Sequence, residues 1–278
     1  MISIISISSK DNPLLRKIRV VAAQARRAPE DWVVVEGIRA LEEASAFSEV
    51  GSVLISENFG RQARGQMLVE RWIANSRTRV YQAPDSIVES VSAVRSSQGA
   101  IALVRMPPKH LGEIPLPPNP LLLCACALQD PGNLGTLIRV ASAAGASMVC
   151  TTPGTVSVRN PKVIRASAGT CFRTPVVESV TPEHLLAYCR ASRIEIYATA
   201  AGGRAICYDT DLRAPTAILV GNEASGFIPE EWPGVPTLRI PMAEGVESLN
   251  VAAAGAVVLF EAFRQRNRTK AARKEPER

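Results

Sequence analysis

The stretch LLLCACALQDPGNLGTLIRVASAAG, residues 121–145, decides the fold of the second half of the chain. Residues 121–128 form a continuous apolar run, which is typical of a strand buried on both faces of a sheet. Residues 130–132, Asp-Pro-Gly, predict a turn. Residues 134–144 predict a helix because apolar side chains recur at i, i+3, i+4 and i+7, and Gly145 ends it as a C′ residue. The stretch therefore predicts a strand, a turn and a helix of an α/β fold.

The turn and the helix also carry candidate ligand-binding residues. Asn133 is expected to cap the helix, and Gly135 leaves the backbone open to a ligand. Arg139 lies about 140° around the helix from Leu134, off the apolar stripe. We expect it to project into a cleft at the carboxyl ends of the strands, where α/β sheets bind their ligands. The alternative is an ordinary strand, turn and helix with a surface arginine.

The rest of the second half repeats this alternation. Strands are expected at residues 148–151, 194–200 and 217–220, and helices at 182–192 and 248–264. The last helix is apolar on nearly all sides, which predicts that it is buried. Strands and helices in this order predict a parallel sheet with right-handed crossovers.

A proline-rich stretch, MPPKHLGEIPLPPNP at residues 106–120, divides the chain as a linker. Residues 1–105 predict a small α/β domain, residues 121–266 a larger one, and residues 267–278 a basic tail. The elements expected in the first domain are strands at 32–35, 53–55, 80–81 and 101–104 and helices at 38–47, 66–73 and 87–94.

Composition excludes several classes of protein. The chain has 278 residues, of which 46% are hydrophobic and 21% charged, so it is neither disordered nor fibrous. Its uncharged apolar runs are far shorter than the roughly 20 residues that span a bilayer, and its start does not resemble a signal peptide, so we expect a cytoplasmic protein. The six cysteines form no CxxC pair and there are only two histidines, so we expect buried, reduced thiols and no metal site.

Positive charge is concentrated near the two ends of the chain. The net charge is +6, from 32 basic and 26 acidic residues, and residues 10–27 and 264–278 each carry a net charge of +5. Two basic segments on a mildly acidic body favour contacts with nucleic-acid phosphates. The alternative is a solubilising helix face and a loose tail.

Two further stretches place polar residues after strands. In AILVGNEASGF, residues 217–227, a buried strand leads to Glu223, and a carboxylate in such a place needs a partner. In LRIPMAEGVESLNV, residues 238–251, a short strand and a loop lead to the last helix, which Ser248 is expected to cap, with Asn250 in its first turn. A helix start of this kind offers hydrogen bonds to a ligand. The alternatives are a strand end with a satisfied glutamate and a helix cap with nothing bound.

In this order, NxGxxxR, VGNExxG and IPMxxxxxSLNV resemble the motifs of the SpoU (TrmH) branch of the SPOUT RNA methyltransferases. The likeness covers residues 121–266, and no GxGxxG or GxxxxGK[ST] loop competes with it. In the first domain, SSKDNPLLRKIR, VVVEGIRALEEA and SSQGAIALV are similar to the L30e-like RNA substrate-binding domain often attached to this family. The resemblance implies a parallel-sheet α/β domain with a trefoil knot at its carboxyl end, a homodimer, and S-adenosylmethionine as methyl donor.

The same resemblance implies the roles of individual residues. It implies methyl transfer to a ribose 2′-hydroxyl of structured RNA, without a metal. The donor pocket would be lined by Val220, Gly221, Ile240, Met242 and Leu249. The catalytic group would be Asn133, Arg139, Glu223, Ser248 and Asn250.

Two matters remain open at this stage. In the family the residue corresponding to Arg139 is assigned as the base, but a guanidinium has a pKa above about 12, so we expect Arg139 mainly to hold the adjoining phosphate. Ribosomal RNA is the expected substrate; the alternatives are transfer RNA and a non-catalytic, ribosome-associated RNA-binding protein. Glu244 and Glu247 depart from many relatives, and their effect is left open.

Overall fold

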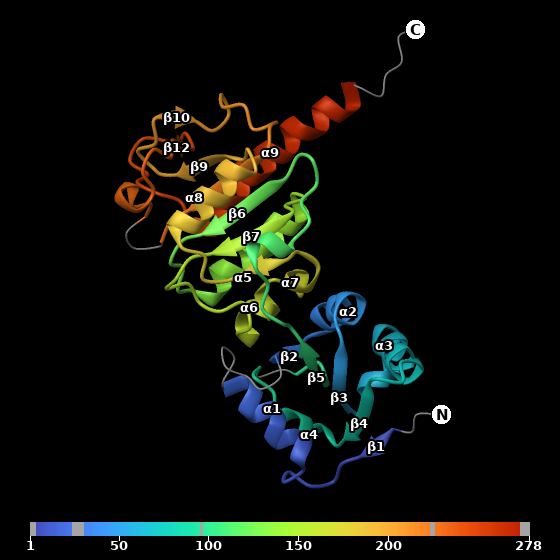
Figure 1. The fold of residues 1–278 in the computed structure, drawn as a ribbon. Helices are drawn as coiled ribbons and strands as arrows, with labels where there is room; N and C mark the ends of the chain where they lie inside the picture. The colour runs from blue at the N-terminus through green and yellow to red at the C-terminus, as the bar shows by residue number, and fades with distance from the viewer. Residues whose placement is uncertain (1–3, 24–30, 95–96, 223–225, 273–278) are drawn as a thin grey trace. The chain divides into compact units, whose positions relative to one another are not determined.

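The computed structural model describes four stretches of the chain (Figure 1), residues 4–23, 31–94, 97–222 and 226–272, with side chains up to residue 267. The chain forms two compact units. Unit 1 is Met1–Pro108 with Ser157–Arg173, and unit 2 is Lys109–Val156 with Thr174–Arg278. The segment Ser157–Arg173 thus joins unit 1, although unit 2 flanks it in the sequence.

Unit 1 is built on a mixed five-stranded sheet in the order β1-β4-β3-β5-β2 (Figure 1). β4 runs parallel to β1 and β3, whereas β5 runs antiparallel to β3 and β2. The strands are β1 (Ile5–Ser6), β2 (Trp32–Glu36), β3 (Val50–Ser56), β4 (Arg79–Ala83) and β5 (Ala100–Arg105). The helices are α1 (Pro13–Ala23), α2 (Ile38–Phe47), α3 (Ala63–Ala74), α4 (Asp85–Glu89), α6 (Pro161–Ala166) and α7 (Thr170–Arg173).

Alternating side chains give the unit 1 sheet two buried faces. Val34, Leu54 and Ile101 share one core cluster with residues of α1 and α4. Val33 and Val35 point to the opposite face, which α2 and α3 cover, and both are buried. The four strands predicted in this part of the chain are confirmed, and α2 has the predicted bounds.

The helix predicted at residues 87–94 is the exception, because α4 ends at Glu89. Ser92 donates from its hydroxyl to the buried carboxylate of Glu36 and accepts a hydrogen bond from the amide of Val94 at 3.1 Å. Side-chain hydrogen bonds of this kind compete with the helical ones, and here they turn the chain out of the helix.

Unit 2 contains an entirely parallel sheet in the order β10-β12-β9-β11-β6-β7-β8 (Figure 1). The predicted fold class is confirmed. The strands are β6 (Leu121–Ala125), β7 (Met148–Thr151), β8 (Val176–Val177), β9 (Glu195–Thr199), β10 (Ala205–Ile206), β11 (Thr216–Val220) and β12 (Thr237–Arg239). The main helices are α5 (Pro131–Ala143), α8 (Pro182–Ala191) and α9 (Val251–Ala272).

The unit 2 sheet is buried on both faces, with α8 on one and α5 and α9 on the other. Cys124, Cys150 and Cys189 lie in the core on the α8 side. All six cysteines are buried and unpaired, as predicted, and burial raises the pKa of the Cys189 thiol to about 12. Leu111 and Ile114 of the proline-rich stretch pack against the same core.

Two boundaries around α5 differ from the prediction. β6 ends at Ala125 rather than residue 128, and Ala127 adopts a positive φ of 50°. α5 begins at Pro131, because Asp130 and not Asn133 is its N-cap: the Asp130 carboxylate accepts from the Asn133 amide at 2.7 Å. Proline directly after the cap is the usual arrangement at a helix start. Gly145 has the predicted left-handed conformation, with φ of 72°.

The segment after β11 returns to an inner position of the sheet. β12 lies between β9 and β10, two strands that are consecutive in the chain. This is the kind of crossing that a knot built from the second and third motifs would produce. Within the described ranges, no helix is long and apolar enough to cross a membrane.

Candidate active site

The three motifs meet at one edge of the unit 2 sheet. The first follows β6, the second follows β11 and the third follows β12. β11 pairs in parallel with β6, and β12 joins the same parallel sheet through β9, so their carboxyl ends lie at the same edge. This is the edge at which parallel α/β sheets bind ligands.

Asn250 connects the third motif to the first. Its Oδ1 accepts hydrogen bonds from the amides of Ala252 at 2.9 Å and Ala253 at 3.3 Å, which makes it the cap of α9. Its Nδ2 donates to Oδ1 of Asn133 at 3.0 Å. Because the cap uses the oxygen of Asn250, the amide nitrogen is directed at Asn133. The amino-terminal ends of α5 and α9 are therefore joined.

This geometry corrects the expectation for Ser248. α9 begins at Val251 and not at residue 248, so Ser248 lies in the preceding loop, where it is exposed. The amide side chain of Asn250 reaches two amides of the first turn, and it takes the role expected of Ser248. α9 is also less buried than predicted, because Phe260 and Phe263 are 45% and 39% exposed.

Arg139 stands apart from this pair. It is exposed on α5 and has no hydrogen bond or ion pair with another described residue. It follows Asn133 by six residues, which is about 9 Å along the helix and a third of a turn from its direction. Within one chain the structure brings Asn133 and Asn250 together but not Arg139.

The second motif forms a tight loop after β11. Val220 ends the strand and is fully buried, and Gly221 follows it. A Cβ on Gly221 would lie 2.3 Å from the carbonyl carbon and oxygen of Gly226, so only glycine permits this approach. Asn222 and Gly226 close the loop with two backbone hydrogen bonds of 3.0 and 2.9 Å. Glu223 lies outside the described residues.

Asn222 is a residue that sequence reasoning missed. Its Nδ2 donates to the carbonyl of Ala127 at 2.6 Å. Ala127 lies just after β6, so this hydrogen bond ties the second motif to the segment that leads into the first motif. The sequence did contain a signal for this role, because Asn222 places an amide side chain between Gly221 and Glu223 at the end of a buried strand. Asp130 was also missed, and the proline after it was the signal there.

The loop of the third motif leaves apolar side chains partly uncovered. Ile240 and Met242 are half-buried, and Leu249 is 39% exposed. Gly245 has a φ of 82°, and the amide of Val246 donates to the carbonyl of Ala243, so Glu244 and Gly245 form a turn. Ile240, Met242 and Leu249 offer partly exposed apolar surface at the sheet edge where Val220 and Gly221 are buried.

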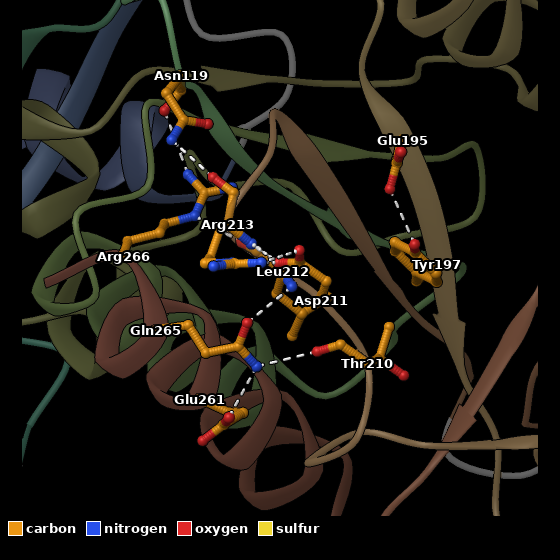
Figure 2. A network of polar contacts seen from close by, with 10 residues as sticks. All are labelled: Asn119, Glu195, Tyr197, Thr210, Asp211, Leu212, Arg213, Glu261, Gln265 and Arg266. Carbon is orange, nitrogen blue, oxygen red and sulfur yellow. Dashed lines mark hydrogen bonds and ion pairs between the residues drawn. The ribbon is translucent and has the colours of Figure 1, made fainter. Parts of the chain in front are cut away.

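A second polar network fastens α9 beyond its middle, at Gln265 and Arg266 (Figure 2). The side chain of Gln265 accepts from the amide of Leu212 at 2.8 Å and donates to the carbonyl of Thr210 at 2.9 Å. Arg266 donates to the carbonyls of Leu212 at 2.9 Å and Asn119 at 3.2 Å, and its partial burial lowers the pKa of the guanidinium. These partners precede β11 and β6, so α9 is fixed at both ends of the sheet.

Among the described residues, no three His, Cys, Asp or Glu side chains gather in a way that would hold a metal ion.

Comparison with known proteins gives consistent matches. The model of the SpoU rRNA methylase family matches residues 120–260. An uncharacterized tRNA/rRNA methyltransferase of Synechocystis is 30% identical over 268 residues, with 94% of each chain covered. The 23S rRNA (uridine(2479)-2′-O)-methyltransferase of Streptomyces viridochromogenes is 32% identical over 214 residues, covering 73% of this chain and 74% of that protein.

Solved structures match over nearly the whole chain. A crystal structure of an RNA 2′-O ribose methyltransferase has a TM-score of 0.80 at 31% identity, covering 95% of this chain and all of the other. The SpoU methyltransferase AviRb of Streptomyces viridochromogenes, in complex with the cofactor AdoMet, has a TM-score of 0.79 at 26% identity, covering 92% of this chain and all of that one.

Proposed function

The chain belongs to the SpoU rRNA methylase family and is an RNA methyltransferase, and we propose that it transfers a methyl group from S-adenosylmethionine to a ribose 2′-hydroxyl of ribosomal RNA. The observation that carries this proposal is the 3.0 Å hydrogen bond between Asn250 and Asn133, which joins two family motifs 117 residues apart at the ligand-binding edge of the sheet. Ribosomal RNA is favoured over transfer RNA because relatives that cover most of the chain act on 23S rRNA by name.

The donor pocket is assigned to the edge formed by the second and third motifs. The residues fit an adenosyl group: Gly221 is packed against the backbone of Gly226 with no room for a side chain, and Leu249 is apolar yet partly exposed. Val220, Ile240 and Met242 supply the rest of the apolar lining. When bound, S-adenosylmethionine supplies a methyl group that its sulfonium already activates. The AdoMet complex of AviRb supports this assignment.

The work left to the protein is to orient the ribose and to handle one proton. A guanidinium group is not a simple base. The fork of N–H groups of Arg139 therefore holds the phosphate beside the target ribose, and that phosphate relays the proton of the 2′-hydroxyl to solvent. Asn133 and Asn250 hold each other in fixed orientations and hydrogen-bond the ribose. Ser248 and Glu223 complete the group that orients the ribose and the methionine end of the donor.

We further propose a homodimer in which α9 lies at the interface. Phe260 and Phe263 are exposed and stand edge to face, with ring centroids 6.0 Å apart. Large apolar side chains that gather on one helix face mark a contact surface. A second chain on this surface would complete a site in which one chain alone leaves Arg139 apart from Asn133 and Asn250.

The domain assignment follows from the same proposal. Residues 1–105 would serve as the RNA-binding domain, which Ser157–Arg173 joins in the fold, and the rest of residues 121–266 as the methyltransferase domain, with the linker at 106–120 and the basic tail at 267–278. The exposed basic residues Arg16, Lys17 and Arg19 on α1 support a role of the first domain in holding RNA.

The test is transfer of labelled methyl from S-adenosylmethionine to separate pools of unmodified ribosomal and transfer RNA. We expect label in ribosomal RNA, its loss in Arg139→Ala, and wild-type label in Arg190→Ala, which removes an exposed arginine from α8 on the opposite face of the sheet. Label in transfer RNA alone would show that the substrate is transfer RNA and not ribosomal RNA. No label in either pool, with donor binding intact, would favour a non-catalytic RNA-binding protein.

A further inference from the structure

The chain leaves β6 through a strained residue. Ala127 has a φ of 50°, in the left-handed region that residues other than glycine rarely adopt. It lies two residues beyond the end of β6 and four residues before Pro131, where α5 begins. Strained backbone persists only where its surroundings hold it, and it is concentrated at functional sites. Resting on the proposed function, we infer that Asn222 is a positioning residue for methyl transfer, because it holds Ala127 in this conformation and so sets where Asn133 lies.

Side chains hold both backbone polar groups of Ala127. Nδ2 of Asn222 donates to the carbonyl of Ala127 at 2.6 Å, and the amide of Ala127 donates to Oγ1 of Thr152 at 2.9 Å. Asn222 lies just after β11 and Thr152 just after β7, and these are the two strands that pair with β6 on either side. Asn222 also follows Gly221 of the proposed donor pocket directly. Its hydrogen bond therefore links that pocket to the segment that leads into α5.

Backbone hydrogen bonds fix the residues on either side of Ala127. The amide of Cys126 donates to the carbonyl of Val220 at 2.9 Å, and the amide of Val156 donates to the carbonyl of Leu128 at 2.7 Å. These bonds remain when a side chain that holds Ala127 is replaced. We therefore expect such a variant to fold, with a change that is confined to the turn between β6 and α5.

The conformation of Ala127 bears on the groups assigned to the ribose. Three residues separate Ala127 from the start of α5, so a change of φ at Ala127 moves Asp130, whose carboxylate caps α5 by accepting from the Asn133 amide at 2.7 Å. Oδ1 of Asn133 in turn accepts from Nδ2 of Asn250 at 3.0 Å. A small displacement of a group that orients the substrate lowers the rate of the chemical step. Asn222 thus acts on the reaction through Asn133.

The experiment measures kcat for methyl transfer by the full-length protein at saturating ribosomal RNA and S-adenosylmethionine. Asn222→Ala should lower kcat about fivefold, the equivalent of one hydrogen bond, and leave KM for RNA unchanged. Thr152→Val removes the other side-chain partner of Ala127 from a different strand and should lower kcat to a similar extent. The matched control is Asn119→Ala, because Nδ2 of Asn119 donates to the carbonyl of Arg213 at 2.7 Å at the opposite edge of the same sheet. The control should keep the kcat of wild type.

Rescue at Ala127 separates positioning from direct contact with a substrate. Glycine adopts a positive φ without strain, so Ala127→Gly keeps the turn with less help from neighbouring side chains. Asn222→Ala should therefore lower kcat about fivefold when Ala127 is present and less than about twofold in combination with Ala127→Gly. Thr152→Val should be rescued in the same way. An equal loss in both backgrounds, an equal loss in Asn119→Ala, or a wild-type kcat in Asn222→Ala would overturn the inference.

Amide hydrogen exchange separates this inference from the proposed function. If wild type transfers no methyl group, the proposed function fails, while exchange at the start of α5 still decides whether Asn222 positions Asn133. The amide of Asn133 should exchange about fivefold faster in Asn222→Ala and at the wild-type rate in Asn119→Ala. Exchange at the wild-type rate in Asn222→Ala would overturn the inference, whether or not the protein transfers methyl groups.

Discussion

Replacing Asn250 separates two roles that the structure gives to one side chain. Its oxygen caps α9 through Ala252 and Ala253, and its nitrogen orients Asn133. Asn250→Ala removes both roles. The lost cap costs about 1 kcal/mol and the lost hydrogen bond about 1 kcal/mol more. At 2–4 °C per kcal/mol, we expect Tm to fall by roughly 4–8 °C.

Asn250→Asp keeps the cap and removes only the donor. A carboxylate still accepts from the first amides of α9, so the cap is kept. The lost hydrogen bond to Asn133 costs about 1 kcal/mol, and the negative charge at the start of α9 offsets about 0.5 kcal/mol of it, so stability should stay within about 0.5 kcal/mol of wild type. The carboxylate cannot donate to Oδ1 of Asn133, so the amide of Asn133 loses its orientation. If that costs one hydrogen bond of about 1.4 kcal/mol in the transition state, methyl transfer falls about tenfold.

The assay pairs thermal unfolding with kcat/KM for methyl transfer to ribosomal RNA. Both variants should lose activity, and only Asn250→Ala should lose stability. Thr181→Ala is the matched control, because Thr181 caps α8 by accepting from the amide of His184 and lies away from the site. It should lose about 1 kcal/mol and keep its activity. Wild-type activity in Asn250→Asp would refute the role given to the Asn133–Asn250 pair.

Three further outcomes are expected. Gly221→Ala should destabilise the protein by about 1–3 kcal/mol and weaken donor binding in calorimetry, because its Cβ meets backbone, whereas Gly202→Ala meets nothing within 4 Å and should match wild type. Phe260→Ser/Phe263→Ser should shift sedimentation toward monomer and lower activity; an unchanged dimer would exclude this face of α9 from the interface. Burial raises the pKa of Cys171 to about 12, so at pH 8 native protein should resist alkylation by iodoacetamide while urea exposes all six thiols; rapid alkylation of the native protein would contradict their burial.

Sequence periodicity predicted most of the elements, because burial dictates it. The apolar run after Pro120 and the stripe of α5 each leave a pattern within a few residues, and both elements were placed correctly apart from their ends. The predicted helix starts were wrong where two neighbouring residues could each cap the same helix. Asp130 caps α5 where Asn133 was predicted, and Asn250 caps α9 where Ser248 was predicted. The capping residue is the one whose side-chain oxygen reaches the free amides of the first turn, and the sequence does not give that distance.

Contacts between distant segments left no local pattern. Nothing near Asn133 in the sequence indicates that Asn250 will donate to it, and nothing near Asn222 points to Ala127. The segment Ser157–Arg173 reads as part of the larger domain but joins unit 1, where Arg173 pairs with Glu43 at 2.7 Å. The motif resemblance gave the candidate residues, and the structure adds the hydrogen bonds that link two of them.

The most direct test of the central claim is the chemical position of the transferred methyl group. Ribosomal RNA labelled by the wild-type protein is hydrolysed in alkali, which cleaves each linkage through its free 2′-hydroxyl. The account predicts label in alkali-stable dinucleotides, absent with Arg139→Ala and retained with Arg190→Ala. Label released as mononucleotides would place the methyl group on a base and contradict transfer to the ribose.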